Sequence, residues 1–425
     1  MTSDSTIVAL RQPDDVDDPL TAILRSGARQ LLAQVIEAEA EAFLARMKGM
    51  RLSDGRDRVV RHGHGPERLV QTGIGPVAVR RVKLRDRGAG AGAGDGERIR
   101  FTSTILPRWA RRTRSLDALL PVLYLRGVSS GDFQEALAAL LGKDAPNLSP
   151  AVLARLKAEW AAEHARWQRR DLSARRYVHL WANGVYLQAR MEPQAECMLV
   201  LIGATPEGRK ELVGFQVGLR ESAQSWRELL ADLKARGLGI APELATGDGA
   251  LGFWKALEAH FPSTRQQRCW VHKAANVLDK MPRSVQPAAK AGLREIWMAP
   301  DRRAAEAAIA IFAEKYAPKY EKAVACLVKD RDALLTFYDF PAEHWDHLRT
   351  ANPIESVFAT VRHRTVRTKG ALSQDTARLM VFKLVMAAAK TWRRLNGENQ
   401  LPKVIRGVTF RDGVEVTDTP AQTAA

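Results

Sequence analysis

Residues 177–218 have the sequence YVHLWANGVYLQARMEPQAECMLVLIGATPEGRKELVGFQVG. Apolar and β-branched residues form runs that are separated by Asn, Gly, Pro and charged residues, which favour turns. These runs predict strands at 177–180, 185–189, 197–203 and 211–218. Helical spacing follows at 225–236, then a short strand at 243–246 and a helix at 253–260. Strands followed by helix, strand and helix indicate an α/β domain with a mixed sheet flanked by helices.

The chain after this region is patterned as helix. Almost everything from residue 273 to 345 has helical spacing, including the Ala-rich run at 301–314, and a last helix is expected to begin near Ile354. We therefore expect an all-helical segment inserted into the α/β domain.

The chain before the strands combines a long helix with basic segments. Residues 1–18 are rich in Asp, Pro and Ser and predict a disordered tail, and apolar residues from Leu20 to Leu44 recur at helical spacing. Two short strands are expected at 68–70 and 77–84, followed by a Gly- and Ala-rich loop at 88–96. The second strand concentrates positive charge, which makes three side chains candidate DNA contacts: Arg80, Arg81 and Lys83.

Residues 113–170 have the pattern of three successive helices. The third begins at Ser149-Pro150, a favourable N-cap and first-turn pair. Three short helices beside basic residues predict a helix-turn-helix module, with Arg155 and Lys157 on the helix that enters DNA. A plain helical bundle or linker remains the alternative.

The patterns together predict a mostly helical N-terminal DNA-binding region, followed by an α/β domain in two parts. The expected segments are a tail (1–18), a helix with a basic hairpin (19–112), a helix-turn-helix-like region (113–170), the first part of the α/β domain (171–272), the helical insertion (273–347), the last part of the α/β domain with a basic helix (348–410) and a tail (411–425).

Charge and composition narrow the class of partner. The 425 residues include 65 Lys and Arg against 48 Asp and Glu, a formal charge of +17. Such a positive chain is unusual for a metabolic enzyme and favours a polyanion such as nucleic acid. No stretch approaches the ~20 apolar residues that span a bilayer, and the three cysteines are far apart in sequence. We expect a cytoplasmic protein that reaches the nucleoid through DNA and has no membrane partner.

Two carboxylates stand where a catalytic metal site would need them. Asp248, in Thr-Gly-Asp-Gly, follows a predicted strand and therefore lies at the carboxyl edge of the sheet, where ligands bind. Glu355 falls in the first turn of a helix opened by Asn352-Pro353. Mg²⁺ prefers oxygen ligands of this kind, although a turn aspartate and a first-turn glutamate also have ordinary structural roles.

Four motifs follow one another along the chain: YVHLWANGVY at 177–186, ATGDG at 245–249, RCWVHK at 268–273 and RTANPIES at 349–356. Together they resemble those of one family, the Mutator-type bacterial insertion-sequence transposases. The resemblance implies a ribonuclease H-like fold and an acidic triad at positions 183, 248 and 355, with the last two 107 positions apart. It also implies two Mg²⁺ ions, for which Mn²⁺ can substitute, and a homodimer acting on double-stranded terminal inverted repeats and target DNA. The implied reaction is 3′-end nicking and strand transfer, with copying out through a circular intermediate.

The first triad position departs from the family pattern. This chain has Asn183 where the family has aspartate. Asparagine is nearly isosteric but neutral, and it removes a charge that helps to hold cations. We expect DNA binding to persist and the chemistry to be lost. Either a deliberate replacement or a decayed natural copy explains the asparagine, and the intact motifs favour the first.

Further residues near the triad have expected supporting roles. Cys269 and His272 are expected beside the active site; a zinc site that adds His344 and His347 is a weaker alternative. Tryptophans such as Trp270 are expected in the core, although Trp270 could also meet an unpaired base. Cations around these motifs are candidate phosphate contacts: Arg268, Lys273, Arg362, Arg364, Arg367 and Lys369.

Two functions from other classes stay open. One is a catalytically inactive, sequence-specific DNA-binding regulator or domesticated transposase, in which Asn183 is native. The other is a ribonuclease H-like resolvase or nuclease, although such an enzyme has no need of a large end-reading region.

Overall fold

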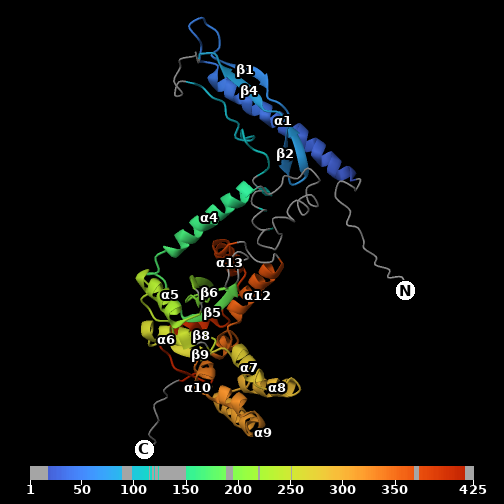
Figure 1. Ribbon diagram of the computed structural model, residues 1–425. Coiled ribbons are helices and arrows are strands. Elements are labelled where there is room, and N and C mark those ends of the chain that lie inside the picture. Colours follow the sequence, from blue (N-terminus) through green and yellow to red (C-terminus); the bar gives the residue numbers. More distant parts are fainter. Residues whose placement is uncertain are drawn as a thin grey trace, which may run out of the picture. The chain divides into compact units, whose positions relative to one another are not determined.

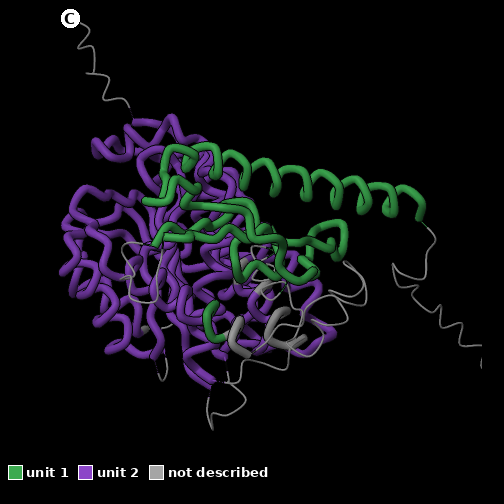
Figure 2. The backbone as a smooth tube through the Cα atoms, turned by 90° about the horizontal axis from the view of Figure 1, so that it is seen from above, with its two compact units in different colours: residues 1–156 green, residues 157–425 purple. Residues whose placement is uncertain are grey.

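The computed structural model describes residues 18–88, 98–113, 115, 116, 119, 123, 150–187, 195–218, 221–249, 251–367 and 373–416. The backbone forms two compact units, residues 1–156 and 157–425, coloured separately in Figure 2. The boundary falls within helix α4 (Pro150–Gln168). No helix in the described ranges combines the length and the apolar character needed to cross a membrane.

The first unit is built on a long helix, α1 (Pro19–Met47). Asp18 caps its first turn by accepting hydrogen bonds from the backbone N–H groups of Leu20 (3.1 Å) and Thr21 (3.3 Å), and Pro19 suits the first helical position. One face of α1 packs through Ile36 and Ala40 against buried valines of the following strands.

Those strands form two antiparallel pairs in the described part of the unit. β1 (Val59–His64) pairs with β4 (Val82–Asp86), and β2 (Arg68–Thr72) pairs with β3 (Gly75–Val79). The hairpin that the sequence predicted around residues 73–76 is confirmed as β2 and β3. The β1–β4 pair was not predicted, and the second predicted strand is divided between β3 and β4.

The predicted strand at 77–84 divides into β3 and β4 because its buried residues change from odd-numbered to even-numbered positions. Val77 and Val79 are buried, and so is Val82. Alternate residues of a strand point to opposite faces, so one continuous strand cannot bury positions 79 and 82 together. The chain breaks at Arg80 and Arg81 instead.

The helix-turn-helix prediction lies mostly outside the described residues. Its third helix is present as α4, which begins at Pro150 as predicted. The first two predicted helices fall between 113 and 149, where four isolated positions are described after Thr113.

In the described part of the second unit, five strands form one mixed sheet in the order β7-β6-β5-β8-β9. β5 runs antiparallel to β6 and parallel to β8, β6 runs antiparallel to β7, and β8 runs parallel to β9. The strands are β5 (His179–Leu187), β6 (Glu196–Ala204), β7 (Lys210–Gly218), β8 (Leu244–Gly247) and β9 (Arg265–Arg268).

The predicted α/β class is confirmed, with two differences in the strands. β5 is one strand where the sequence predicted two, because Asn183 and Gly184 pair with Val200 and Leu199 rather than forming a turn. β9 was not predicted, because its four residues are all polar.

Helices cover both faces of the sheet. On one face, α5 (Ala223–Ala235) and α6 (Leu251–His260) bury Trp226 and Leu257 against alternate residues of β5, such as Leu180. α12 (Asn352–Arg367) contacts β5 and β6, and α13 (Gln374–Ala389) packs on α12 and β7 (Figure 1).

The chain between β9 and α12 is helical throughout. α8 packs on α9, and α7 contacts both (Figure 1). The helices of this stretch are α7 (Trp270–Leu278), α8 (Gln286–Trp297), α9 (Arg302–Val328), α10 (Arg331–Leu334), η2 (Thr336–Asp339), η3 (Ala342–His344) and α11 (Trp345–Leu348). The last elements are η4 (Glu398–Gln400), α14 (Leu401–Ile405), β10 (Phe410–Arg411) and β11 (Val414–Glu415).

Candidate active site

The sheet brings Asn183 and Asp248 to the same edge. β5 and β8 are parallel neighbours whose register pairs Ala182 with Gly247. Asn183 and Asp248 each follow these paired residues by one position, and neighbouring strands lie about 4.8 Å apart. Asn183 on β5 and Asp248 just after β8 are therefore neighbours across the sheet, at the end where β8 terminates.

Glu355 joins them from a different part of the chain. It lies in the first turn of α12, which packs against β5. The Asn183 amide donates a hydrogen bond from Nδ2 to Oε1 of Glu355, across 172 positions of sequence. The other amide atom, Oδ1, accepts the backbone N–H of Gly184 at 2.8 Å. The structure thus places positions 183, 248 and 355 around one edge of the sheet.

The segment just before α12 is tied to the strands by hydrogen bonds from the other motifs. Trp181 Nε1 of β5 donates to the His347 carbonyl at 2.8 Å, and Thr246 Oγ1 of β8 donates to the Leu348 carbonyl at 2.8 Å. The backbone N–H of Trp270 donates to the Arg349 carbonyl at 3.0 Å.

A fourth contact completes this attachment. The Cys269 sulfur accepts the backbone N–H of Ala351 at 3.2 Å, and the Cys269 side chain is buried. All four sequence motifs therefore meet within the few residues that position Glu355.

His272 contacts the same carboxylate. Its Nε2 lies 3.3 Å from Oε1 of Glu355. The Cys269 sulfur and the Glu355 carboxylate raise the pKa of His272 to about 10, so the imidazole is protonated at neutral pH. The same contact with His272 holds the pKa of Glu355 below its ordinary value. Cys269 and His272 thus lie beside the triad positions, where the sequence placed them.

The donor set does not fit a two-metal centre while residue 183 is asparagine. Asp248 and Glu355 offer carboxylate oxygens, but Asn183 directs an N–H group towards Oε1 of Glu355. The His272 ring contacts the same oxygen. In the part of the chain that the structure describes, no three His, Cys, Asp or Glu side chains converge to hold a metal ion.

One acid at this edge was not found from the sequence. Glu221 precedes α5, and an added Cβ at Gly184 would lie 3.0 Å from its Oε2. Its Oε1 accepts Trp226 Nε1 at 3.1 Å. Burial, together with the nearby charge of Asp248, raises the pKa of Glu221 to about 7. It approaches β5 from the α5 side, opposite to Glu355, and no sequence motif marks it.

Two predicted DNA contacts are instead interior cations. Arg268 is buried, with its guanidinium 4.0 Å from the Trp254 ring centroid and its Nη1 3.4 Å from the Asp248 carbonyl. Lys273 is buried against Asp330 and donates to the Cys326 carbonyl at 2.9 Å. These contacts support the site from within, so neither side chain is placed to reach a phosphate.

The remaining predicted contacts fall into three groups. Arg80, Arg155, Lys157 and Arg362 are exposed, and Arg81 and Lys83 are half-buried. Arg364 and Arg367 belong to α12, but their side chains lie outside the described part of the structure. Lys369 lies outside the described residues altogether.

The zinc alternative is not supported. His344 is buried beside the His179 ring and 2.9 Å from the Gly397 carbonyl, and His347 lies 3.5 Å from Lys210. These contacts differ from those of Cys269 and His272, and no metal-binding group of three forms in the described residues. Trp270 is buried and donates to the Leu334 carbonyl at 2.9 Å, which confirms the core prediction and rules out a base contact.

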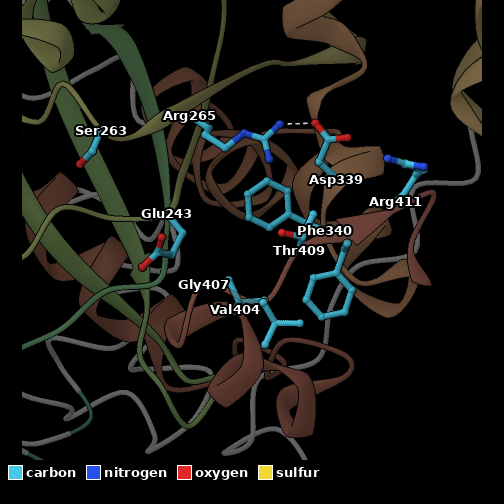
Figure 3. A pocket seen from close by; sticks show the side chains of 11 residues that line it. Glu243, Ser263, Arg265, Asp339, Phe340, Val404, Gly407, Thr409 and Arg411 are labelled. Carbon is cyan, nitrogen blue, oxygen red and sulfur yellow. Dashed lines mark hydrogen bonds and ion pairs between the residues drawn. The ribbon is translucent and has the colours of Figure 1, made fainter. Parts of the chain in front are cut away.

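A separate hollow of about 470 Å³ opens at the opposite edge of the sheet (Figure 3). Arg265, at the start of β9, reaches Asp339 across the Phe340 ring, whose centroid is 5.2 Å from its guanidinium. Glu243, which precedes β8, pairs with Arg176 at 3.1 Å. Arg265 and Glu243 are thus each paired with a side chain of opposite charge, and Arg411 also lines the hollow.

Comparison with known proteins identifies relatives over most of the chain. The family model described as transposase, Mutator family, matches residues 2–394. The transposase for insertion sequence element IST2 of Acidithiobacillus ferrooxidans is 52% identical over 295 residues, covering 69% of this chain and all of that protein. The transposase for IS6120 of Mycolicibacterium smegmatis is 49% identical over 298 residues, covering 70% of this chain and 92% of that protein.

Proposed function

The chain belongs to the Mutator family of transposases, and from that premise we propose that it is a DNA transposase whose active centre lies at positions 183, 248 and 355. The observation that carries this proposal is the contact between Asn183 and Glu355 beside the end of β8. The contact joins residues from two of the four motifs, and the register of β5 with β8 adds Asp248 from a third.

We infer that the sheet is ribonuclease H-like. If its strands are numbered in chain order, they lie across the sheet in the order 3-2-1-4-5. In the described sheet, strand 2 (β6) alone is antiparallel to the other four. The helices between β9 and α12 then form an insertion before the last acidic position. Both inferences support the triad assignment, because they place its members on elements that meet.

The proposed substrates are the two terminal inverted repeats of an insertion sequence and a target duplex. The reaction is hydrolytic nicking that frees a 3′-hydroxyl, followed by attack of that hydroxyl on a second phosphodiester, with copying out through a circular intermediate. Both ends must be held together, for which we propose a homodimer. The net charge of +17 supports a polyanionic substrate.

We propose that this form of the chain binds DNA but does not cut it. Asn183 donates an N–H to Glu355 where an aspartate would add a third carboxylate, the ligand type that Mg²⁺ prefers. Bound Mg²⁺ or Mn²⁺ would supply activation of the attacking oxygen and neutralisation of charge on the phosphate. His272 and the attachment of residues 347–351 hold Glu355 in place for that role.

The test is a paired nicking and strand-transfer assay on duplexes that carry the ends of the insertion sequence. The parent chain and the Asn183→Asp variant are compared in Mg²⁺ and in Mn²⁺. We expect end binding by both proteins and cleavage by the variant alone, at least 100-fold above the parent. A double variant, Asn183→Asp with Glu355→Gln, serves as the control and is expected to be silent.

The same assay separates the alternative. If neither protein cuts while both bind the ends, the triad assignment fails and a DNA-binding regulator becomes the better account. What favours that second function is the residue type at position 183, because a neutral asparagine holds a cation less well than a carboxylate does.

A further inference from the structure

Trp109 in the first unit is a large apolar side chain left in solvent. It is 81% exposed, and the Arg108 guanidinium lies 5.3 Å from its ring centroid. Tryptophan ordinarily contributes to cores and interfaces because its burial releases a large apolar area. An exposed tryptophan beside cations therefore calls for a partner that takes both a ring and positive charge.

The loop that carries Trp109 is held in place. The Arg68 side chain donates to the carbonyls of Pro107 (2.9 Å) and Arg108, and the Ala110 N–H donates to the Pro107 carbonyl at 3.0 Å. The Gln71 N–H of β2 donates to the Arg111 carbonyl at 2.9 Å. A ring on such a fixed loop loses little conformational freedom when it binds.

A hollow of about 420 Å³ lies beside this loop. Leu69 is 58% exposed on β2, while its neighbour Val70 points into the core between the strands and α1. The hollow therefore lies on the outer face of the β2–β3 hairpin. We call it the Trp109 groove; its lining is Arg68, Leu69, Gln71, Pro76, Arg108, Trp109, Ala110 and Arg111.

The positive charge around the groove is not balanced. Arg108 and Arg111 are exposed, and among the described residues neither forms an ion pair with a carboxylate. Burial and the charge of Arg81 lower the pKa of Arg68. An anion bound in the groove would raise that pKa again. Over residues 51–88 and 98–113 as a whole, fifteen Lys and Arg face four Asp and Glu.

We propose that the Trp109 groove is a duplex-DNA contact of the first unit, with the exposed Arg108 and Arg111 on phosphates and the Trp109 ring against a sugar or base edge. The proposal rests on the proposed function, because it assigns a surface to the DNA that a transposase must hold. Arginine neutralises phosphate charge and gives salt-dependent affinity, whereas a ring adds contact that salt does not screen. A second protein chain would need an acidic complement to the same rim.

The test measures binding of the full-length parent chain, which is expected not to cut, to labelled duplexes by fluorescence anisotropy at several salt concentrations. Trp109→Ala is expected to weaken binding of the insertion-sequence ends about tenfold and to leave the salt dependence almost unchanged. Arg111→Gln is expected to weaken binding and to reduce the slope of log affinity against log salt by about 1. Leu31→Ala, which removes another exposed apolar side chain of this unit, is the control and should bind as the parent does.

Each outcome decides the matter. Unchanged affinity in both Trp109→Ala and Arg111→Gln, with unfolding temperatures equal to that of the parent, overturns the proposal. A change in oligomeric mass by light scattering with unchanged DNA affinity assigns the groove to a second copy of the chain and also overturns it. Since binding is measured without cleavage, failure of Asn183→Asp to nick DNA would sink the proposed function and leave this result intact.

Discussion

Replacing Glu221 with glutamine should stabilise the protein above neutral pH. Burial and the charge of Asp248 raise the pKa of Glu221 from its ordinary value of 4.5 to about 7. A carboxyl with a raised pKa binds more protons when folded than when unfolded, so the stability of the protein falls as pH rises from 4.5 to 7. A difference of about 2.5 between the two pKa values corresponds to about 3 kcal/mol, and partial exposure reduces this to about 2 kcal/mol.

The Glu221→Gln variant keeps an oxygen that can accept the Trp226 indole N–H, which Glu221 accepts at 3.1 Å. The free energy of unfolding of parent and variant is to be measured by denaturant titration, with a metal chelator, between pH 4.5 and 8.5. We expect near equality at the acid end and an advantage of about 2 kcal/mol for the variant above pH 7. Thermal unfolding of a unit of this size should shift upward by about 4 to 8 °C at pH 8.

Glu258→Gln is the matched control, because Glu258 is an exposed glutamate on α6. Its stability difference from the parent should not change with pH. If the Glu221→Gln variant shows no advantage at pH 8, or the same advantage at pH 5 and pH 8, then Glu221 ionises without cost. The explanation that burial and the charge of Asp248 disfavour the ionised form of Glu221 would then be wrong.

Two further predictions concern the stability of each unit. Hydrogen bonds from the Arg58 side chain are the chief cause that lowers the pKa of Asp86 to about 2, so this carboxylate should stabilise the first unit fully above about pH 4 and lose that contribution as pH falls towards 2. Asp86→Asn should lower the free energy of unfolding at pH 7 by about 2 kcal/mol in a denaturant titration, and an unchanged midpoint would contradict this. Gly203→Ala should destabilise the second unit by about 1–3 kcal/mol, because the added Cβ would lie 2.5 Å from the buried Tyr177 ring. Gly49→Ala is the control, because its added Cβ would meet no atom within 4 Å, and equal melting temperatures for the two variants would refute the packing argument.

The sequence predicted the positions of elements better than their limits. The apolar runs on β6 and β7 were found, because both strands are buried along most of their length and show it in composition. β9, an edge strand, was missed because Arg265–Arg268 has no apolar residue; its second half is buried, and there Gln267 donates to the Leu334 carbonyl at 3.0 Å. Such a strand is stabilised by partners 67 positions away, which a local pattern does not contain.

The candidate site was predictable where motifs carried it and not elsewhere. Asp248 and Glu355 were selected from their places at a strand end and in a first helical turn, and the resemblance added Asn183; the structure places the three at one edge of the sheet. Glu221 was missed because nothing in its neighbourhood on the chain distinguishes it from a helix-flanking glutamate. Arg268 and Lys273 were assigned to DNA because charge in sequence resembles charge at a surface, and burial is decided by tertiary packing.

The attachment of residues 347–351 to β5, β8 and α7 bears on how the helical stretch before it can vary in length. The chain leaves the sheet after β9 and returns at these residues, where Trp181 and Thr246 donate hydrogen bonds to the His347 and Leu348 carbonyls. The Cys269 sulfur, at the start of the excursion, accepts the Ala351 N–H at its end. The entropic cost of closing a loop grows only logarithmically with its length, so doubling such an excursion costs about 0.6 kcal/mol. Loop closure alone therefore sets little limit on the length of this stretch, and the limit comes instead from packing: Leu334 and Asp330 hold Gln267 and Lys273 beside the sheet, so a change of length is compatible with the position of Glu355 only where those contacts are kept.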